Sequence, residues 1–185
     1  MRNPQHLTLG FRMRSAGVQN TKETDMRKPW LWMFVCVFCL PALAHQTTEQ
    51  ERNKAIARSF FEQVLDQGHF DKYAESHASD FVAHAGTHTA SLAEDMADAK
   101  EERMALPDMR FKVNETLAER DLVFVYWTAS GTNTHEGMGF PATGKKITVD
   151  GMTLFRFKAG KIQEEWNVMD MLSAMRQAGL LPPAQ

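Results

Sequence analysis

The chain has 185 residues, of which 43% are hydrophobic and 24% are charged, with a formal net charge of −2. This composition and length are those of a globular protein with one domain. From His45 onward, 15 Lys and Arg residues stand against 21 Asp and Glu residues, a net charge of −6. An acidic chain without basic runs argues against a nucleic-acid partner.

Residues 26–44 have the pattern of a secretory signal peptide, with cations at Arg27 and Lys28, an apolar run over 30–40 and small residues before the expected cleavage after Ala44. The main alternative is a permanent membrane anchor. The apolar run is about a dozen residues long, whereas a helix that spans a bilayer needs roughly 20. We therefore expect a periplasmic or secreted protein with no stable membrane anchor after cleavage.

The first 25 residues are polar and lack apolar periodicity. They form either a disordered extension or the product of a start codon assigned too early, since Met26 makes a better start. Both cysteines, Cys36 and Cys39, lie in the predicted signal peptide, which excludes cysteine chemistry from the mature chain. Without internal repeats or long linkers, residues 45–185 are predicted to form one domain.

The first half of this domain is predicted to be mainly helical. A helix begins at the capping box of Thr48 and Glu51 and ends before Gly68. A short second helix follows over 69–77, then an extended piece over 80–85. Residues 91–106 form a polar-faced helix that ends before Pro107.

The second half is rich in β-branched and aromatic residues from Met109 onward. A last helix is predicted over 168–178, before Gly179. Helices that precede a meander of antiparallel strands favour an α+β fold, in which one face of a curved antiparallel sheet packs on helices and encloses a cavity. The predicted strands are 109–119, 122–132, 145–158 and 161–166.

Three stretches in this order carry a family resemblance: "FFEQVLDQGHFDKYAESHASDFVAH", "GTNTHEGMGFPATGKKITVDGMTLFRFKAGKIQEEW" and "VMDMLSAMRQAGLLP". Over residues 52–182 the chain resembles the SnoaL-like polyketide cyclases, also described as predicted ester cyclases, of the nuclear transport factor 2-like superfamily. The resemblance implies a cone-shaped curved antiparallel sheet wrapped around N-terminal helices, with a deep, mostly apolar pocket. It also implies proton transfer on a small carbonyl compound without metal or cofactor.

In the best understood members, an aspartate after the last strand removes the proton and a histidine on the preceding strand assists. These positions correspond to Asn167 and Thr153 in this chain, and both depart from the pattern. An amide cannot accept a proton near neutral pH, so Asn167 can orient a substrate carbonyl but cannot be the base. Asparagine is also a preferred N-cap, and Asn167 is predicted to cap the last helix.

Three other residues are candidates for the missing catalytic group. Asp170 is a candidate if its side chain turns inward, although a carboxylate in a first helical turn usually serves the helix dipole. Glu165 alternates with Asn167 along a strand, so both would face the pocket, where burial would raise the pKa of Glu165. His84 could polarise a carbonyl at the pocket mouth, or simply pack in a loop.

Asn167, Thr153, Trp127 and Trp166 are predicted to contact the substrate, with core packing as the alternative for the aromatic residues. His84 and His88 do not make a convincing metal pair because Gly86 interrupts the segment, and neither metal nor cofactor is expected. Three functions remain open. The chain could be a cofactor-independent enzyme, a binding module for a small apolar molecule, or an interaction domain that forms a homodimer through the outer face of its sheet.

Overall fold

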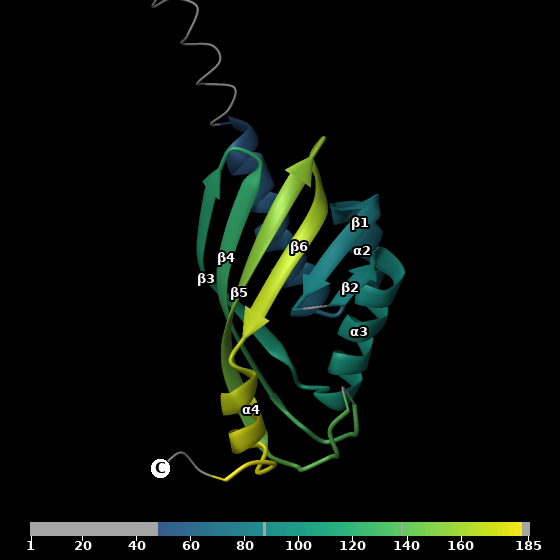
Figure 1. The fold of residues 1–185 in the computed structure, drawn as a ribbon, viewed down its shortest axis with the longest axis vertical. Coiled ribbons are helices and arrows are strands. Elements are labelled where there is room, and N and C mark those ends of the chain that lie inside the picture. Colours follow the sequence, from purple (N-terminus) through teal and green to yellow (C-terminus); the bar gives the residue numbers. More distant parts are fainter. Residues whose placement is uncertain (1–47, 87, 138, 183–185) are drawn as a thin grey trace, which may run out of the picture. The chain divides into compact units, whose positions relative to one another are not determined.

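The computed structural model describes residues 48–86, 88–137 and 139–182 of the chain (Figure 1). The predicted signal peptide 26–44, the extension 1–25 and both cysteines lie outside the described residues. Within the described ranges, no helix is long and apolar enough to cross a membrane.

The helices follow the order predicted from the sequence. The first continues without a break from α-helix into a π-helical segment, and α3 begins with a capping box in which the Ser91 backbone N–H donates to Glu94 Oε2 over 2.8 Å. In Figure 1 the first helix lies against one face of the sheet, and α3 covers the end formed by β1 and β2. The described helices are residues 48–59, η1 (Phe60–Leu65), η2 (Phe70–Lys72), α2 (Tyr73–Ser76), α3 (Leu92–Ala105) and α4 (Met171–Gln177).

The strands form one curved, open sheet in the order β2-β1-β6-β5-β4-β3. The predicted antiparallel meander is confirmed from β3 to β6, whereas β1 pairs with β6 in parallel and with β2 in antiparallel orientation. The strands are β1 (His77–Ala85), β2 (His88–Ser91), β3 (Arg110–Glu119), β4 (Leu122–Thr132), β5 (Lys146–Lys158) and β6 (Lys161–Met169).

The core lies between the first helix and the inner face of the sheet. The rings of Phe60 and Phe61 pack edge-on against Phe155, with centroids 6.1 Å apart in each pair. Val123 and Val125 of β4 are also fully buried here. Burial of each such side chain stabilises the fold by about 1.5–3 kcal/mol. This core fixes the first helix against the sheet and thereby sets one wall of the site described below.

One glycine shapes the inner face of the sheet. Gly151 of β5 is the cross-strand partner of Trp127 on β4, and a Cβ atom at Gly151 would overlap the Trp127 indole. The absent side chain lets the indole lie flat over the neighbouring strand, a close approach that only glycine permits. Trp127 is 2% exposed, and its Nε1–H donates to Thr153 Oγ1 over 3.0 Å.

The predicted start of the last helix is wrong. β6 continues to Met169 because Gly151 of the long strand β5 still pairs with Met169. Asn167 therefore lies within the strand and does not cap a helix. The N-cap of α4 is Asp170, whose Oδ1 accepts from the Ser173 backbone N–H over 2.9 Å.

Candidate functional site

A cavity of about 380 Å³ lies between the first helix, α3 and the inner face of the sheet. Its described lining combines aromatic walls with carboxylates, so it is more acidic than the mostly apolar pocket that the family resemblance implies. The aromatic residues are Phe60, Phe61, Tyr73, Phe111 and Trp127, the acidic residues are Asp95, Asp98, Glu101, Glu102 and Glu165, and the others are Leu65, Ala99, Asn167 and Met169.

Glu165 is the most deeply buried carboxylate on this wall. Strand alternation directs Glu165 and Asn167 of β6 to the same face, and both line the cavity. Glu165 is 7% exposed, and Asn167 Nδ2 donates to its Oε1 over a long 3.5 Å. Burial, and secondarily the charge of Asp95, raise the pKa of Glu165 to about 8. Near neutral pH this group can therefore both hold and release a proton.

Asp95 of α3 is held on the opposite wall by Tyr73. The Tyr73 hydroxyl donates a short hydrogen bond to Asp95 Oδ2. Burial raises the pKa of Asp95, and the Tyr73 hydrogen bond opposes that increase. Burial and then the charge of Asp95 raise the pKa of Tyr73, so this phenol keeps its proton and remains a donor. The pair gives the cavity a fixed second carboxylate.

Asn167 and Thr153, the positions to which the family resemblance assigns the catalytic pair, are direct cross-strand partners on β6 and β5. Thr153 is fully buried, and its hydroxyl oxygen accepts from the Trp127 indole. Asn167 Oδ1 is buried and has no hydrogen-bond partner among the described residues. Of the four predicted substrate contacts, Asn167 and Trp127 line the cavity, and Thr153 lies directly behind Trp127.

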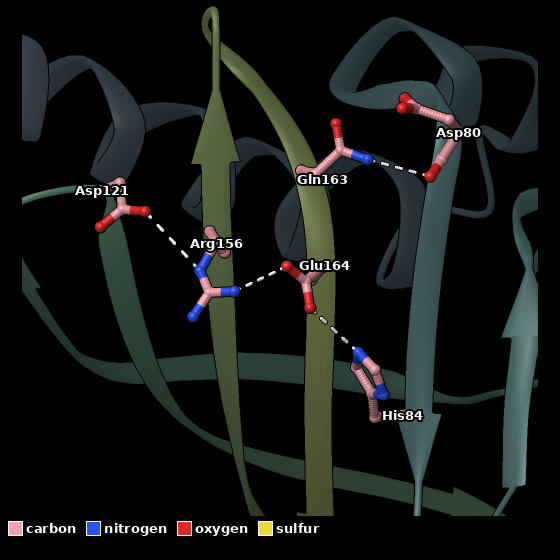
Figure 2. A network of polar contacts seen from close by, with 6 residues as sticks. All are labelled: Asp80, His84, Asp121, Arg156, Gln163 and Glu164. Carbon is pink, nitrogen blue, oxygen red and sulfur yellow. Dashed lines mark hydrogen bonds and ion pairs between the residues drawn. The ribbon is translucent and has the colours of Figure 1, made fainter.

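His84 and Trp166 lie on the other face of the sheet, away from the cavity. His84 Nε2 lies 3.2 Å from Glu164 Oε2, and Glu164 Oε1 accepts from Arg156 Nη1 over 2.7 Å. Figure 2 shows these contacts together. The His84 imidazole stacks on the Trp166 indole at an interplanar angle of 6°. The same network includes an ion pair between Arg156 and Asp121 at 3.6 Å. This arrangement places His84 in a surface network and not at the pocket mouth.

Asp170 is exposed and engaged as the N-cap of α4, and it does not line the cavity. His88 is exposed on β2 beside Ala85, its cross-strand partner. Within the described ranges, no group of three or more His, Cys, Asp or Glu side chains could hold a metal ion. Of the three proposed catalytic residues, the structure thus brings only Glu165 to the cavity.

Sequence reasoning missed the acidic face of α3. Asp95, Asp98 and Glu102 recur at spacings of three and four residues, which places them on one side of the helix. Burial raises the pKa of Glu102 to about 7, and the nearby Arg103 opposes this increase. The helical spacing of these residues was visible in the sequence. That this face is directed toward the cavity was not, because a charged helix face normally lies in water.

Glu102 and Met169 also border a second, smaller cavity of about 70 Å³. Its described lining is largely apolar and includes Met171, Met175 and Leu180 in and after α4. The shared residues place this apolar space beside the acidic cavity.

A sequence model of the family described as SnoaL-like polyketide cyclase matches residues 55–178. Curated protein sequences give no match. Among solved structures, AclR of Streptomyces galilaeus is similar with a TM-score of 0.68 at 24% identity, over 74% of this chain and 90% of AclR. A SnoaL-like protein of Jannaschia sp. CCS1 gives 0.66 at 20% identity, over 72% of this chain and 95% of that protein. IdmH of Streptomyces antibioticus gives a TM-score of 0.61 at 23% identity, over 69% of this chain and 98% of IdmH. These similarities show a common fold.

Proposed function

We propose, since the chain belongs to the SnoaL-like polyketide cyclase family, that its cavity carries out cofactor-independent proton transfer on a small carbonyl compound with an apolar body. Glu165 is the proton-transfer group in this proposal. Asn167, at the position of the family's catalytic aspartate, orients the substrate oxygen. Trp127 supplies part of the apolar wall.

The proposed reaction begins with Glu165 as a carboxylate. It removes a proton from a carbon next to the substrate carbonyl, and the electron pair of the broken C–H bond forms an enolate. The second N–H of the Asn167 amide, which is not directed to Glu165, donates to the enolate oxygen. The enolate carbon then attacks a second carbonyl carbon of the same molecule, closing a ring, and the proton on Glu165 passes to the new alkoxide oxygen. Atoms and charge balance without any co-reactant.

The observation that supports this assignment most strongly is the buried position of Glu165 on the inner face of β6. A base must face the cavity, lie near the family's catalytic position and exchange protons near neutral pH. Glu165 meets each requirement, since it is two residues from Asn167 and has a pKa raised to about 8. Asp170 and His84 fail the first, because neither lines the cavity.

The test uses a cell-envelope metabolite extract in deuterated water, incubated with purified protein and followed by mass spectrometry. We expect one compound to gain deuterium or to be converted by the wild-type protein. Glu165→Gln should slow this change about 100-fold or more. The matched control is Glu164→Gln. Glu164 immediately precedes Glu165 and lies on the outer face of the sheet, so this change should leave the rate unchanged. Equal rates for wild type and Glu165→Gln would exclude Glu165 as the base.

The same experiment separates the enzyme from a binding module. Retention of a compound on the protein without deuterium uptake or conversion would favour non-catalytic binding. That alternative has its own support, because Asn167 cannot act as the base that the family uses at this position.

We further propose export to the periplasm or medium, which the pattern of residues 26–44 supports, and assembly into a homodimer. The dimer is favoured by an apolar patch on the outer sheet face, where Met152 and Val168 are cross-strand partners with 47% and 66% of their surface exposed. Val168→Lys should then convert a dimer into a monomer in analytical ultracentrifugation. A wild-type monomer at high concentration would exclude the dimer.

A further inference from the structure

The ionisable side chains of the cavity wall favour negative charge. Five carboxylates line the cavity, and no Lys, Arg or His is among its described lining residues. Three of the five, Asp95, Asp98 and Glu102, come from one face of α3, while Glu165 faces them from β6. A wall of this kind attracts a positive charge and repels a negative one.

Glu165 is under-partnered for a carboxylate that is 7% exposed. Its hydrogen bond from Asn167 Nδ2 is 3.5 Å long, at the outer limit for such a bond. Asn167 Oδ1, on the other side of the same amide, is buried without a partner among the described residues. Buried acceptors of this kind normally find a donor, so the missing donor would come from a ligand.

Most donors on the wall are already engaged. The Tyr73 hydroxyl donates to Asp95, and the Trp127 indole N–H donates to Thr153 Oγ1. One of the two N–H groups of the Asn167 amide is directed to Glu165. The site therefore offers acceptors to a ligand more readily than donors.

Aromatic faces complete the arrangement. Phe61 and Trp127 lie with ring centroids 6.0 Å apart, and Phe111 lies 5.4 Å from Trp127. Aromatic rings attract cations through their faces, an interaction that strengthens where water is excluded. An organic cation would thus meet carboxylates on one side and aromatic rings on the other.

We propose that the natural ligand of this cavity carries a protonated amine, which lies between Asp95 of α3 and Glu165 of β6. The apolar body of the ligand packs against Trp127 and Phe111. This inference names the substrate class of the site and rests on the proposed function in taking the cavity as the substrate site. The amine anchors the molecule, and its carbonyl lies on the Asn167 side of Glu165.

The test measures binding of three probes of one shape by isothermal titration calorimetry at pH 7. They are 4-phenylbutylamine, which is protonated at this pH, the neutral 4-phenyl-1-butanol and the anionic 4-phenylbutanoate. We expect the amine to bind at least about tenfold more tightly than the alcohol, since hydrogen bonds to charged groups are the stronger kind. The carboxylate should bind most weakly. Of the three probes, only the amine should bind more weakly when salt is added.

Variants locate the effect. Asp95→Asn and Glu165→Gln keep the shape of each side chain and replace its carboxyl group with an amide that cannot ionise to pair with the amine. Each should reduce the amine's advantage over the alcohol about tenfold while leaving alcohol binding unchanged. Glu164→Gln, on the outer face of β6, is the matched control and should alter neither affinity.

Equal or weaker binding of the amine relative to the alcohol, including no measurable binding of either, would overturn the amine assignment. So would an amine preference that survives the double variant Asp95→Asn with Glu165→Gln. The outcomes for the proposed reaction and for the proposed ligand class can be told apart. Amine-selective binding without deuterium uptake would refute proton transfer but support an amine ligand. Deuterium uptake by a neutral ketone, without a preference for the amine, would support proton transfer but refute the amine ligand.

Discussion

Asn167 Nδ2 lies 3.5 Å from Glu165 Oε1, with both side chains on the inner face of β6 and two residues apart. The family resemblance assigns the position of the catalytic aspartate to Asn167, and the carboxylate of Glu165 lies two residues earlier on the same face, on a side chain one methylene longer. The amide that replaces the aspartate contacts the carboxylate that can replace its function. We interpret Glu165 as the catalytic base and Asn167 as the residue beside it that orients the substrate oxygen.

The rate of the proposed reaction should rise with pH through about 8. Glu165 acts as a base only when ionised, and its pKa is raised to about 8 by burial and by Asp95. The measurement is the initial rate of deuterium uptake by the substrate between pH 5 and 10. A rate already constant above pH 5.5 would indicate an ordinary carboxylate and contradict the assignment.

Asn167→Asp should make the protein less stable than wild type, and the loss should grow with pH. The new carboxylate would lie close to Glu165, and two such charges in a buried site repel each other. We expect a loss of roughly 2–4 kcal/mol at pH 9 and much less at pH 5, where the pair retains protons. Urea unfolding at both pH values measures the difference.

The control for this prediction is Asn167→Ala, which removes the amide without adding charge. Asn167→Ala should lower the free energy of unfolding by a similar amount at pH 5 and pH 9. If Asn167→Asp also shows the same loss at both pH values, Asn167 and Glu165 do not interact as charges.

Gly151→Ala should destabilise the fold by about 1–3 kcal/mol, the usual cost of overpacking. The added methyl group would overlap the Trp127 indole and force it away from Thr153. Urea unfolding of Gly151→Ala, of Trp127→Leu and of the double variant forms a double-mutant cycle. Because the smaller leucine removes the overlap, the double variant should cost less than the sum of the single changes. Strict additivity would show that the two residues do not compete for the same space.

Stability should fall as pH rises from about 4.5 to 8, because the two buried glutamates Glu165 and Glu102 together outweigh His77. Burial lowers the pKa of His77 from 6.5 to about 4, so its neutral form stabilises the fold above pH 6.5, and this contribution is lost as pH falls toward 4. The pKa of Glu165 is raised from 4.5 to about 8 and that of Glu102 to about 7. Their neutral forms stabilise the fold below pH 4.5, and that contribution is lost as pH rises through these values.

Thermal unfolding between pH 4.5 and 9 tests this, with Tm expected to be lower at pH 9 than at pH 4.5 by about 5 °C or more. Glu165→Gln should make this fall in Tm smaller. A Tm that rises from pH 4.5 to pH 9 would contradict the burial of Glu165 and Glu102 as acids.

Much of this fold follows from sequence patterns. β-branched and aromatic alternation predicts β3 to β5 almost to the residue, and Ser91 with Pro107 brackets α3. The end of β6 could not be predicted, because Asn167 suits a helix N-cap as well as a strand. Pairing of Gly151 with Met169, a contact between distant residues, decides between the two.

The site was less predictable than the fold. Alternation along β6 places Glu165 beside Asn167, but nothing local shows which of the adjacent Glu164 and Glu165 faces inward. The facing carboxylate, Asp95, is about seventy residues away in sequence, and only the packing of α3 over the sheet brings it there. His84 was predicted to lie at the pocket mouth. The parallel pairing of β1 with β6 instead places it beside Trp166 on the outer face.

The protonation of Glu165 can be measured directly and without a substrate. The side-chain carboxyl carbons of glutamate are labelled with carbon-13, and their chemical shifts are followed by NMR between pH 3 and 10, with Glu165→Gln used to assign the Glu165 signal. We expect Glu165 to titrate near pH 8, far above an ordinary glutamate. Titration near pH 4.5 would mean that Glu165 is a solvated carboxylate, and it would contradict the proposal that this residue carries the proton in the cavity.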